Sequence, residues 1–236
     1  MKKSEVRKMI REMIVEAGQA AGSLEIAKTS VDKAVEFVKK IGLYDDIQDF
    51  EKNYLYTQKL ANLGKTQRKN MPVIDDPDIK TFQKRLKLGT LDINKPFAPE
   101  TSDNNPWPEG LSGWDAQEFV KNGFKDGSKK DDVIGVSIRQ VVVGKLKPIQ
   151  KQIYLSKSAG QTKKSGVETT RKFLTSKTFF VASGDNFIID GHHRWLSAIL
   201  IDPNMKVNVL SIDLPINKLL PLANAYGDAI GNKRNQ

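Results

Sequence analysis

The segment that most constrains the fold runs from residue 179 to 201 and reads FFVASGDNFIIDGHHRWLSAILI. Its apolar stretches at 179–183 and 187–190 flank a Gly-Asp-Asn sequence, a composition typical of tight turns, and together they predict a β-hairpin. Residues 192–201 then place apolar side chains at helical spacing, which predicts a helix directly after the second strand. We therefore expect a strand, a glycine turn and a helix in immediate succession.

Both histidines of the chain, His192 and His193, lie in this segment between Asp190-Gly191 and Arg194. The N–H groups of a helix's first turn and the positive end of its dipole form an anion site. Gly191 permits a sharp turn and a close approach of phosphate to the backbone, and Arg194 offers a planar fork to phosphate oxygens. Consecutive helical residues point about 100° apart, so we expect one histidine to face a ligand and the other to lock the turn. The sequence thus predicts a phosphate-binding or catalytic site.

Asp190 lies at the end of a strand that we expect to be buried, and three roles are open to it. It could hold Mg²⁺, orient a histidine or cap the helix. The chain has no cysteine, which excludes disulfides, iron–sulfur clusters and cysteine nucleophiles. A zinc site is not expected either, because adjacent imidazoles chelate one metal poorly and there is no third histidine.

The formal net charge of the chain is +10, and the positive charge is concentrated in one window. Between Arg139 and Lys177 there are ten basic residues and a single acid, Glu168. Such a field favours a phosphate-bearing partner, which is a nucleotide, a nucleic acid or a phosphometabolite. The alternative is a solvated basic face that serves solubility.

The chain divides by its patterns into three parts. Residues 1–89 predict helices, at 4–18, 25–41, 46–63 and 79–88. Residues 90–130 hold four prolines and predict a linker with one short helix at 115–121. Residues 131–236 predict a small α/β (α+β) domain. Its expected elements are strands at 133–146, 179–183, 187–190 and 207–214, a turn or short helix at 149–157, a flexible basic loop at 160–166, and helices at 167–174, 192–201 and 216–225.

The first 18 residues carry charges throughout and have no uninterrupted apolar core. We therefore expect neither a signal peptide nor a membrane span, and a cytoplasmic location. This lysine-rich opening resembles that of tailed-phage proteins, for which the location would be the host cytoplasm.

Three segments resemble motifs of the ParB/sulfiredoxin superfamily. GDNFIIDGHHRWLSAI (184–199) is similar to the superfamily's signature of a strand, a glycine-containing turn and a helix that begins with basic residues. KLKPIQKQIYLSK (145–157) resembles its first motif, and VNVLSIDLPINKLLPLA (207–223) its closing strand and helix. The match covers about residues 133 to 226. It implies a small mixed-sheet domain that binds nucleotide phosphates at the turn.

The residues of this chain narrow the functions that the resemblance implies. Sulfiredoxins use a cysteine in this turn, and this chain has none, so that activity is excluded. Chromosome-partitioning ParB proteins continue into a helix-turn-helix and a dimerisation domain, for which too few residues follow the motif. Two types are left: the free-serine kinase type, which uses ATP or ADP with Mg²⁺, and the ParB-like nucleases.

The kinase type implies nucleotide-dependent phosphotransfer. The phosphates would lie on Gly191, His192, His193 and Arg194, with Asp190 helping Mg²⁺. Lys151, Lys157 or Lys163 would neutralise the other side of the phosphates. Such kinases take their base from a glutamate of the first motif, whereas residues 149–157 offer two glutamines and no acid. The base then lies elsewhere, the acceptor differs, or the protein binds or hydrolyses nucleotide without an acceptor.

Two alternatives use the same turn. In a ParB-like nuclease, a histidine would be the general acid or base, Arg194 would stabilise the developing charge, and the basic window would follow the DNA backbone. In a non-catalytic module, the domain would bind nucleotide or DNA within a larger assembly, and residues 1–89 would dock a protein partner. Our leading expectation is nucleotide binding with phosphotransfer or hydrolysis, and no membrane partner.

Overall fold

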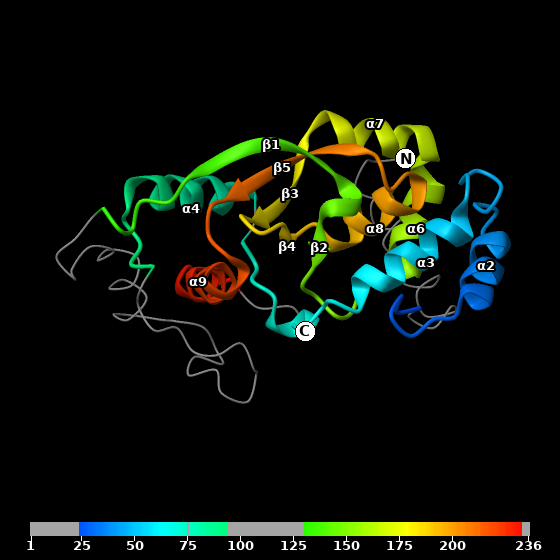
Figure 1. The fold of residues 1–236 in the computed structure, drawn as a ribbon, viewed down its shortest axis with the longest axis horizontal. Coiled ribbons are helices and arrows are strands. Elements are labelled where there is room, and N and C mark those ends of the chain that lie inside the picture. The colour runs from blue at the N-terminus through cyan, green and yellow to red at the C-terminus, as the bar shows by residue number, and fades with distance from the viewer. Residues whose placement is uncertain (1–23, 75, 94–129, 233–236) are drawn as a thin grey trace, which may run out of the picture. The chain divides into compact units, whose positions relative to one another are not determined.

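The computed structural model describes residues 24–74, 76–93 and 130–232, and it shows an α/β mixed fold with helices before the sheet (Figure 1). This confirms the predicted fold class. The regular elements of the described residues are, in chain order, α2 (Val31–Lys40), α3 (Phe50–Ala61), η1 (Arg68–Asn70), α4 (Asp76–Leu88), β1 (Val136–Val142), η3 (Val143–Lys145), β2 (Lys147–Pro148), α6 (Leu155–Ser165), α7 (Val167–Ser176), β3 (Thr178–Ser183), β4 (Phe187–Asp190), α8 (His192–Ile201), β5 (Lys206–Ile212) and α9 (Ile216–Ala229).

The five strands form one sheet in the order β1-β5-β3-β4-β2. The β3–β4 pair is the predicted hairpin. It is antiparallel, with Val181 opposite Asp190, Ala182 opposite Ile188, and a register shift between Val181 and Ala182. Asn186 in its turn has a φ of +69°, in the left-handed region that asparagine tolerates better than most residues. The hairpin leads the chain directly to the start of α8.

The chain divides into two compact units. One comprises the described residues of Met1–Gly64, Gln140–Phe179 and Gly191–Asn208, and the other those of Lys65–Arg139, Phe180–Asp190 and Val209–Gln236. Each unit thus combines segments that precede and segments that follow the proposed linker. The boundaries at 89/90 and 130/131 stay predictions, and the expected helices at 4–18 and 115–121 lie outside the described residues.

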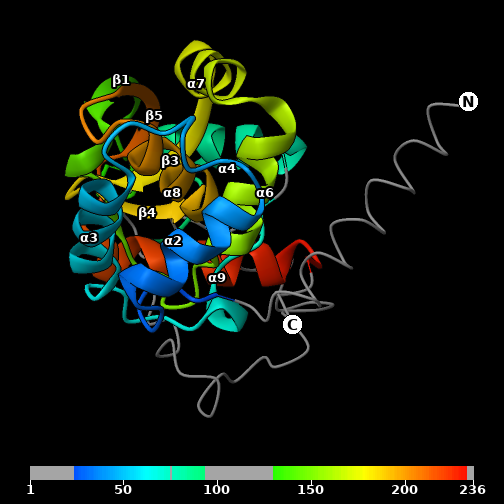
Figure 2. The same cartoon turned by 90° about the vertical axis from the view of Figure 1, so that its right-hand side faces the viewer.

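The first unit is built around α8, which is buried at His192 and at every residue from Trp195 to Ile201. Helices α3, α6 and α7 pack against α8, and α2 packs against α3 and α6 (Figures 1 and 2). A helix that is covered on all sides requires apolar residues all round, which is what the sequence WLSAILI supplies. The helix that carries the histidine pair is therefore the centre of its unit.

Helix α6 corrects one prediction. Residues 160–166 were expected to form a flexible basic loop, but all except Gly166 belong to this helix. Its buried residues are Leu155, Ser158, Ala159 and Thr162, which follow helical spacing. The glycine and lysines of the segment suggested a loop. The helix forms because its small side chains pack against α8 while its lysines remain exposed.

Helix α2 begins later than predicted, at Val31 instead of residue 25. The Oγ of Ser30 accepts a hydrogen bond from the N–H of Lys33 at 3.4 Å, so a side chain caps its start. Gly42 follows its end with a φ of +68°, as expected of a glycine at a helix C-terminus. Residues 24–26 instead pair with the backbone of residues 153–155, through Ile26 N–H to Ile153 O at 3.0 Å and Leu155 N–H to Leu24 O at 2.8 Å.

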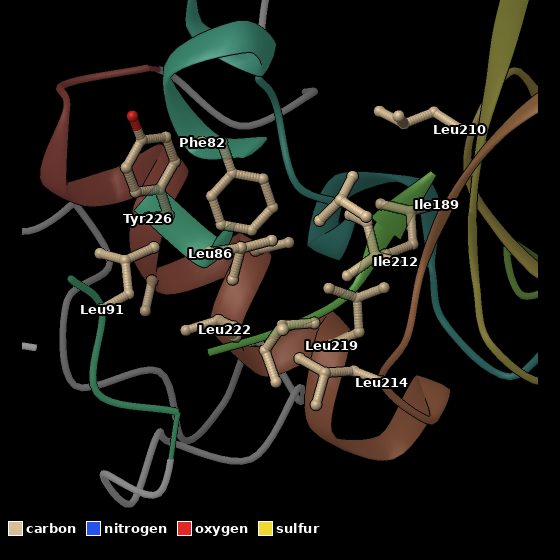
Figure 3. Packing of buried hydrophobic residues seen from close by; sticks show 14 residues of the cluster. Phe82, Leu86, Leu91, Ile189, Leu210, Ile212, Leu214, Leu219, Leu222 and Tyr226 are labelled. Atoms are coloured by element: carbon tan, nitrogen blue, oxygen red, sulfur yellow. The ribbon is translucent and has the colours of Figure 1, made fainter. Parts of the chain in front are cut away.

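The second unit has a core in which α4 and α9 pack with β1, β4 and β5 (Figure 3). Phe82 of α4 and Tyr226 of α9 have ring centroids 4.7 Å apart, and Leu86 and Leu222 pack in the same cluster. Each large apolar side chain buried in this way contributes about 1.5–3 kcal/mol. This core includes Ile189 of β4, the strand that ends at Asp190.

Candidate functional site at the start of helix α8

The strand-to-helix turn has the predicted form. Strand β4 ends at Asp190, and α8 begins at His192. Between them, Gly191 has a φ of +104° and a ψ of 15°, a left-handed conformation that costs a residue with a β-carbon about 1–2 kcal/mol. Gly191 is itself the N-cap, and its carbonyl accepts the N–H of Trp195 at 2.8 Å. Asp190 is exposed and is not the cap, so the capping role considered for it is not observed.

The two imidazoles make the same kind of contact. The Nε2 atom of His192 accepts a hydrogen bond from the backbone N–H of Gln150 at 3.3 Å. The Nε2 atom of His193 accepts one from the backbone N–H of Tyr154, also at 3.3 Å. A ring nitrogen that accepts a hydrogen bond carries no proton, so the proton of each neutral ring lies on Nδ1. His192 is 5% exposed, and the half-buried ring of His193 stacks on Tyr154 with centroids 6.1 Å apart.

The partner of both histidines is one stretch of chain, residues 149–155, which we call the 149–155 segment. It belongs to the predicted first motif and leads into α6. The Oγ of Ser158 donates to the carbonyl of His193 at 3.0 Å, and the Oγ of Ser197 donates to the carbonyl of Ser158 at 3.3 Å. A β-carbon on Gly64 would lie 2.6 Å from the carbonyl oxygen of Gln150, so only glycine allows this approach. The segment thus lies against Gly64, and α6, which follows it, is joined to α8 through Ser158.

The predicted phosphate-binding cations fall into two groups. Arg194 lies half-buried in the first turn of α8, Lys151 is exposed within the 149–155 segment, and Lys157 is exposed in the first turn of α6. Lys163 lies near the other end of α6, where its Nζ donates to the carbonyl of Gly42 and is 3.5 Å from a carboxylate oxygen of Asp46. The structure therefore places Lys151 and Lys157, but not Lys163, in the stretches that contact the histidines.

The residues at the turn suit a phosphate group better than a free metal ion. The left-handed glycine, the helix N-terminus and the arginine are features that recur in protein sites for phosphate. Within residues 24–74, 76–93 and 130–232, no three histidine or carboxylate side chains gather where they could hold a metal. Mg²⁺ that arrives with a nucleotide takes only one or two protein carboxylates, however, and Asp190 could supply one.

A large open cleft of about 1620 Å³ lies elsewhere in the first unit. Its lining includes Ile201 and Asp202 at the C-terminal end of α8, about 14 Å along the helix from His192. Its other walls come from residues 44–59, η3, the start of α7 and the turn before β5. Sequence reasoning gave no signal for this cleft, because its walls are separate stretches of chain without a shared motif. Its charges have both signs, and we assign it no role.

No family model, no curated protein and no solved structure matches this chain. Among the described residues, no helix combines the length and the apolar character that crossing a bilayer requires. The ParB/sulfiredoxin resemblance and the cytoplasmic location therefore stay predictions.

Proposed function

We propose that this protein, of ParB/sulfiredoxin type, binds the phosphates of a nucleotide at residues 190–194 and catalyses nucleotide-dependent phosphotransfer or hydrolysis there. The observation that carries the proposal is Gly191, whose φ of +104° lets α8 begin immediately after β4. In this arrangement the helix N-terminus, with its partial positive charge, forms an anion site at the turn.

The cations around the turn support a phosphate ligand. Arg194 presents a planar guanidinium that suits two oxygens of one phosphate. Lys151 and Lys157 belong to the stretches that the histidines and Ser158 hold against α8. These three side chains provide the positive charge that a di- or triphosphate requires.

Phosphoryl transfer depends mainly on positioning and on electrostatic stabilisation, and this is the chemistry that the turn supports. The 149–155 segment carries amides at Gln150 and Gln152 and no carboxylate. An acceptor hydroxyl would therefore need its base from another part of the protein, and water is the simplest acceptor. Mg²⁺, when bound with the nucleotide, would neutralise phosphate charge with Asp190 as one protein ligand.

Calorimetric titration with ATP, ADP and CTP in the presence of Mg²⁺ tests the binding, with adenosine as a phosphate-free control. We expect the nucleotides but not adenosine to bind. Arg194→Lys keeps the charge and loses the fork, so affinity should fall about tenfold. Lys172→Ala removes an exposed cation of the same basic window on α7 and serves as the matched control, with affinity within about twofold. Absence of nucleotide binding, or unchanged affinity in Arg194→Lys, would reject the proposal.

The nuclease alternative is favoured by one observation, the exposed lysines of α6 and α7, which include Lys164 and Lys172. Phosphate release from nucleotides, with and without serine, should be measured beside cleavage of supercoiled and single-stranded DNA. Nucleotide turnover that is lost in Arg194→Ala would support the leading proposal. DNA cleavage without nucleotide turnover would replace it with the nuclease function, and binding without either reaction would indicate a non-catalytic module.

A further inference from the structure

Two consecutive histidines bind the same short segment, and this constrains how the segment runs. Side chains of successive helical residues point about 100° apart. The Nε2 atoms of His192 and His193 nevertheless both accept N–H groups from the 149–155 segment, at Gln150 and Tyr154. The segment must therefore curve around the start of α8, with one histidine near each end of the curve.

Each of these contacts satisfies a backbone donor of the 149–155 segment, which is buried at Gln150 and partly buried at Tyr154. Gln150 is 5% exposed and lies in a β-bridge outside the named strands, and its N–H donates to Nε2 of His192. Tyr154 is the N-cap of α6, and its N–H obtains its partner from His193. Buried backbone N–H groups are almost always paired in folded proteins. Both histidines thus provide hydrogen-bond acceptors for backbone donors of the 149–155 segment.

We propose that His192 and His193 are positioning residues: with their protons on Nδ1, they fix the 149–155 segment to α8 and so place Lys151 and Lys157 beside the phosphate turn. The link to phosphate rests on the proposed function, whereas the fixing of the segment does not. A lone pair that accepts a backbone N–H cannot at the same time take a proton from a substrate. The Nε2 atoms therefore act as acceptors for the protein itself and not as general bases.

Conservative variants separate these roles. The side-chain carbonyl of glutamine reaches approximately as far as Nε2, accepts a hydrogen bond and does not transfer protons at neutral pH. Phenylalanine keeps a ring of similar shape and has no acceptor. His→Gln should therefore preserve the segment at either position, and His→Phe should release it. Ser197→Ala is the matched control, because it removes a hydrogen bond between α8 and α6 without touching the N–H of Gln150 or Tyr154.

Amide hydrogen exchange of the full chain at fixed pH, without ligand, is the first measurement. We expect the amide of Gln150 in His192→Phe, and that of Tyr154 in His193→Phe, to exchange about tenfold faster or more. The glutamine variants and Ser197→Ala should stay within about threefold of the parent chain. Long-range ¹H–¹⁵N spectra of the parent chain should show Nε2 as the unprotonated nitrogen of both rings. Unchanged exchange in the phenylalanine variants, or protons on Nε2, would overturn the proposal.

Nucleotide affinity and turnover of the same variants are the second measurement. The phenylalanine variants should bind about tenfold more weakly, and the glutamine variants should recover most of that loss in both affinity and turnover. If glutamine abolishes turnover as completely as phenylalanine, the histidines exchange protons or contact the ligand, and the proposal is wrong. If the parent chain binds no nucleotide, the proposed function fails, and the exchange data alone decide whether the segment is fixed. Should a phenylalanine variant not fold, His→Asn replaces it, because that shorter amide does not reach the segment.

Discussion

Substitution of Asn53 in α3 tests whether this N-terminal helix packs against α8, the helix that carries the candidate site. Its buried side chain donates from Nδ2 to the carbonyl of Gln48 at 3.2 Å and to the carbonyl of Leu200 at 3.0 Å. Leu200 lies in the last turn of α8, where carbonyls have no partner within the helix. Asn53 therefore caps the C-terminal end of the helix whose N-terminal end forms the proposed phosphate-binding turn.

The expected cost of Asn53→Ala follows from these two contacts. Each lost hydrogen bond contributes about 0.5–1.5 kcal/mol, and a buried carbonyl left without a donor costs about 1–3 kcal/mol. Because Leu200 is 1% exposed, the second range applies to its carbonyl, and we expect the free energy of unfolding to fall by about 2–3 kcal/mol. Asn53→Asp keeps the shape but brings a carboxylate oxygen to two carbonyl oxygens. The free energy of unfolding of Asn53→Asp should therefore fall by at least as much at neutral pH.

Urea denaturation followed by circular dichroism measures these differences, provided that the dependence on urea is unchanged between variants. Asn62→Ala, at an exposed position after the end of α3, is the matched control and should change the unfolding free energy by less than about 0.5 kcal/mol. If Asn53→Ala is as stable as this control, α3 does not cap α8. The assignment of α3 to the same packed unit as α8 would then be wrong.

Two further variants test the interior of the same unit. Tyr54 is fully buried, and burial raises its pKa from 10.0 to about 12, partly offset by its hydrogen bond to Thr29. Its contribution to stability is therefore complete below pH 10 and is lost as the pH rises from 10 towards 12, by up to about 3 kcal/mol. In Tyr54→Phe, the thermal melting temperature should fall less steeply with pH over that range. At pH 7 the substitution should lower the unfolding free energy by only about 1 kcal/mol, since Gln58 also donates to the Thr29 carbonyl. If the variant loses stability between pH 10 and 12 as steeply as the parent chain, the assignment of this loss to Tyr54 is wrong. Gly64→Ala forces a β-carbon against the Gln150 carbonyl and should lower the unfolding free energy by about 1–3 kcal/mol. Calorimetry should also show weaker nucleotide binding. Unchanged stability and affinity would contradict the close approach of Gly64 to Gln150.

The elements that depend only on neighbouring residues could be predicted from the amino-acid sequence. The hairpin around Asn186, the left-handed Gly191 and the helix His192–Ile201 all lie where turn composition and apolar periodicity placed them. Gly42 likewise ends α2 in a left-handed conformation. Such features are local, because a turn needs particular residues at particular positions and a helix shows its buried face in its own spacing.

The groups that the site residues contact could not be predicted from the sequence. The imidazoles accept backbone N–H groups from a segment about 40 positions earlier in the chain, and since every residue but proline has such a donor, no sequence pattern reveals it. The sequence does not distinguish Lys163 from Lys151 and Lys157 as a phosphate-binding cation, whereas in the structure Lys163 contacts Gly42 and Asp46. Residues 160–165 continue α6, which packs against α8 and buries Ser158, Ala159 and Thr162. These outcomes depend on contacts between distant segments, which exist only once the chain has packed.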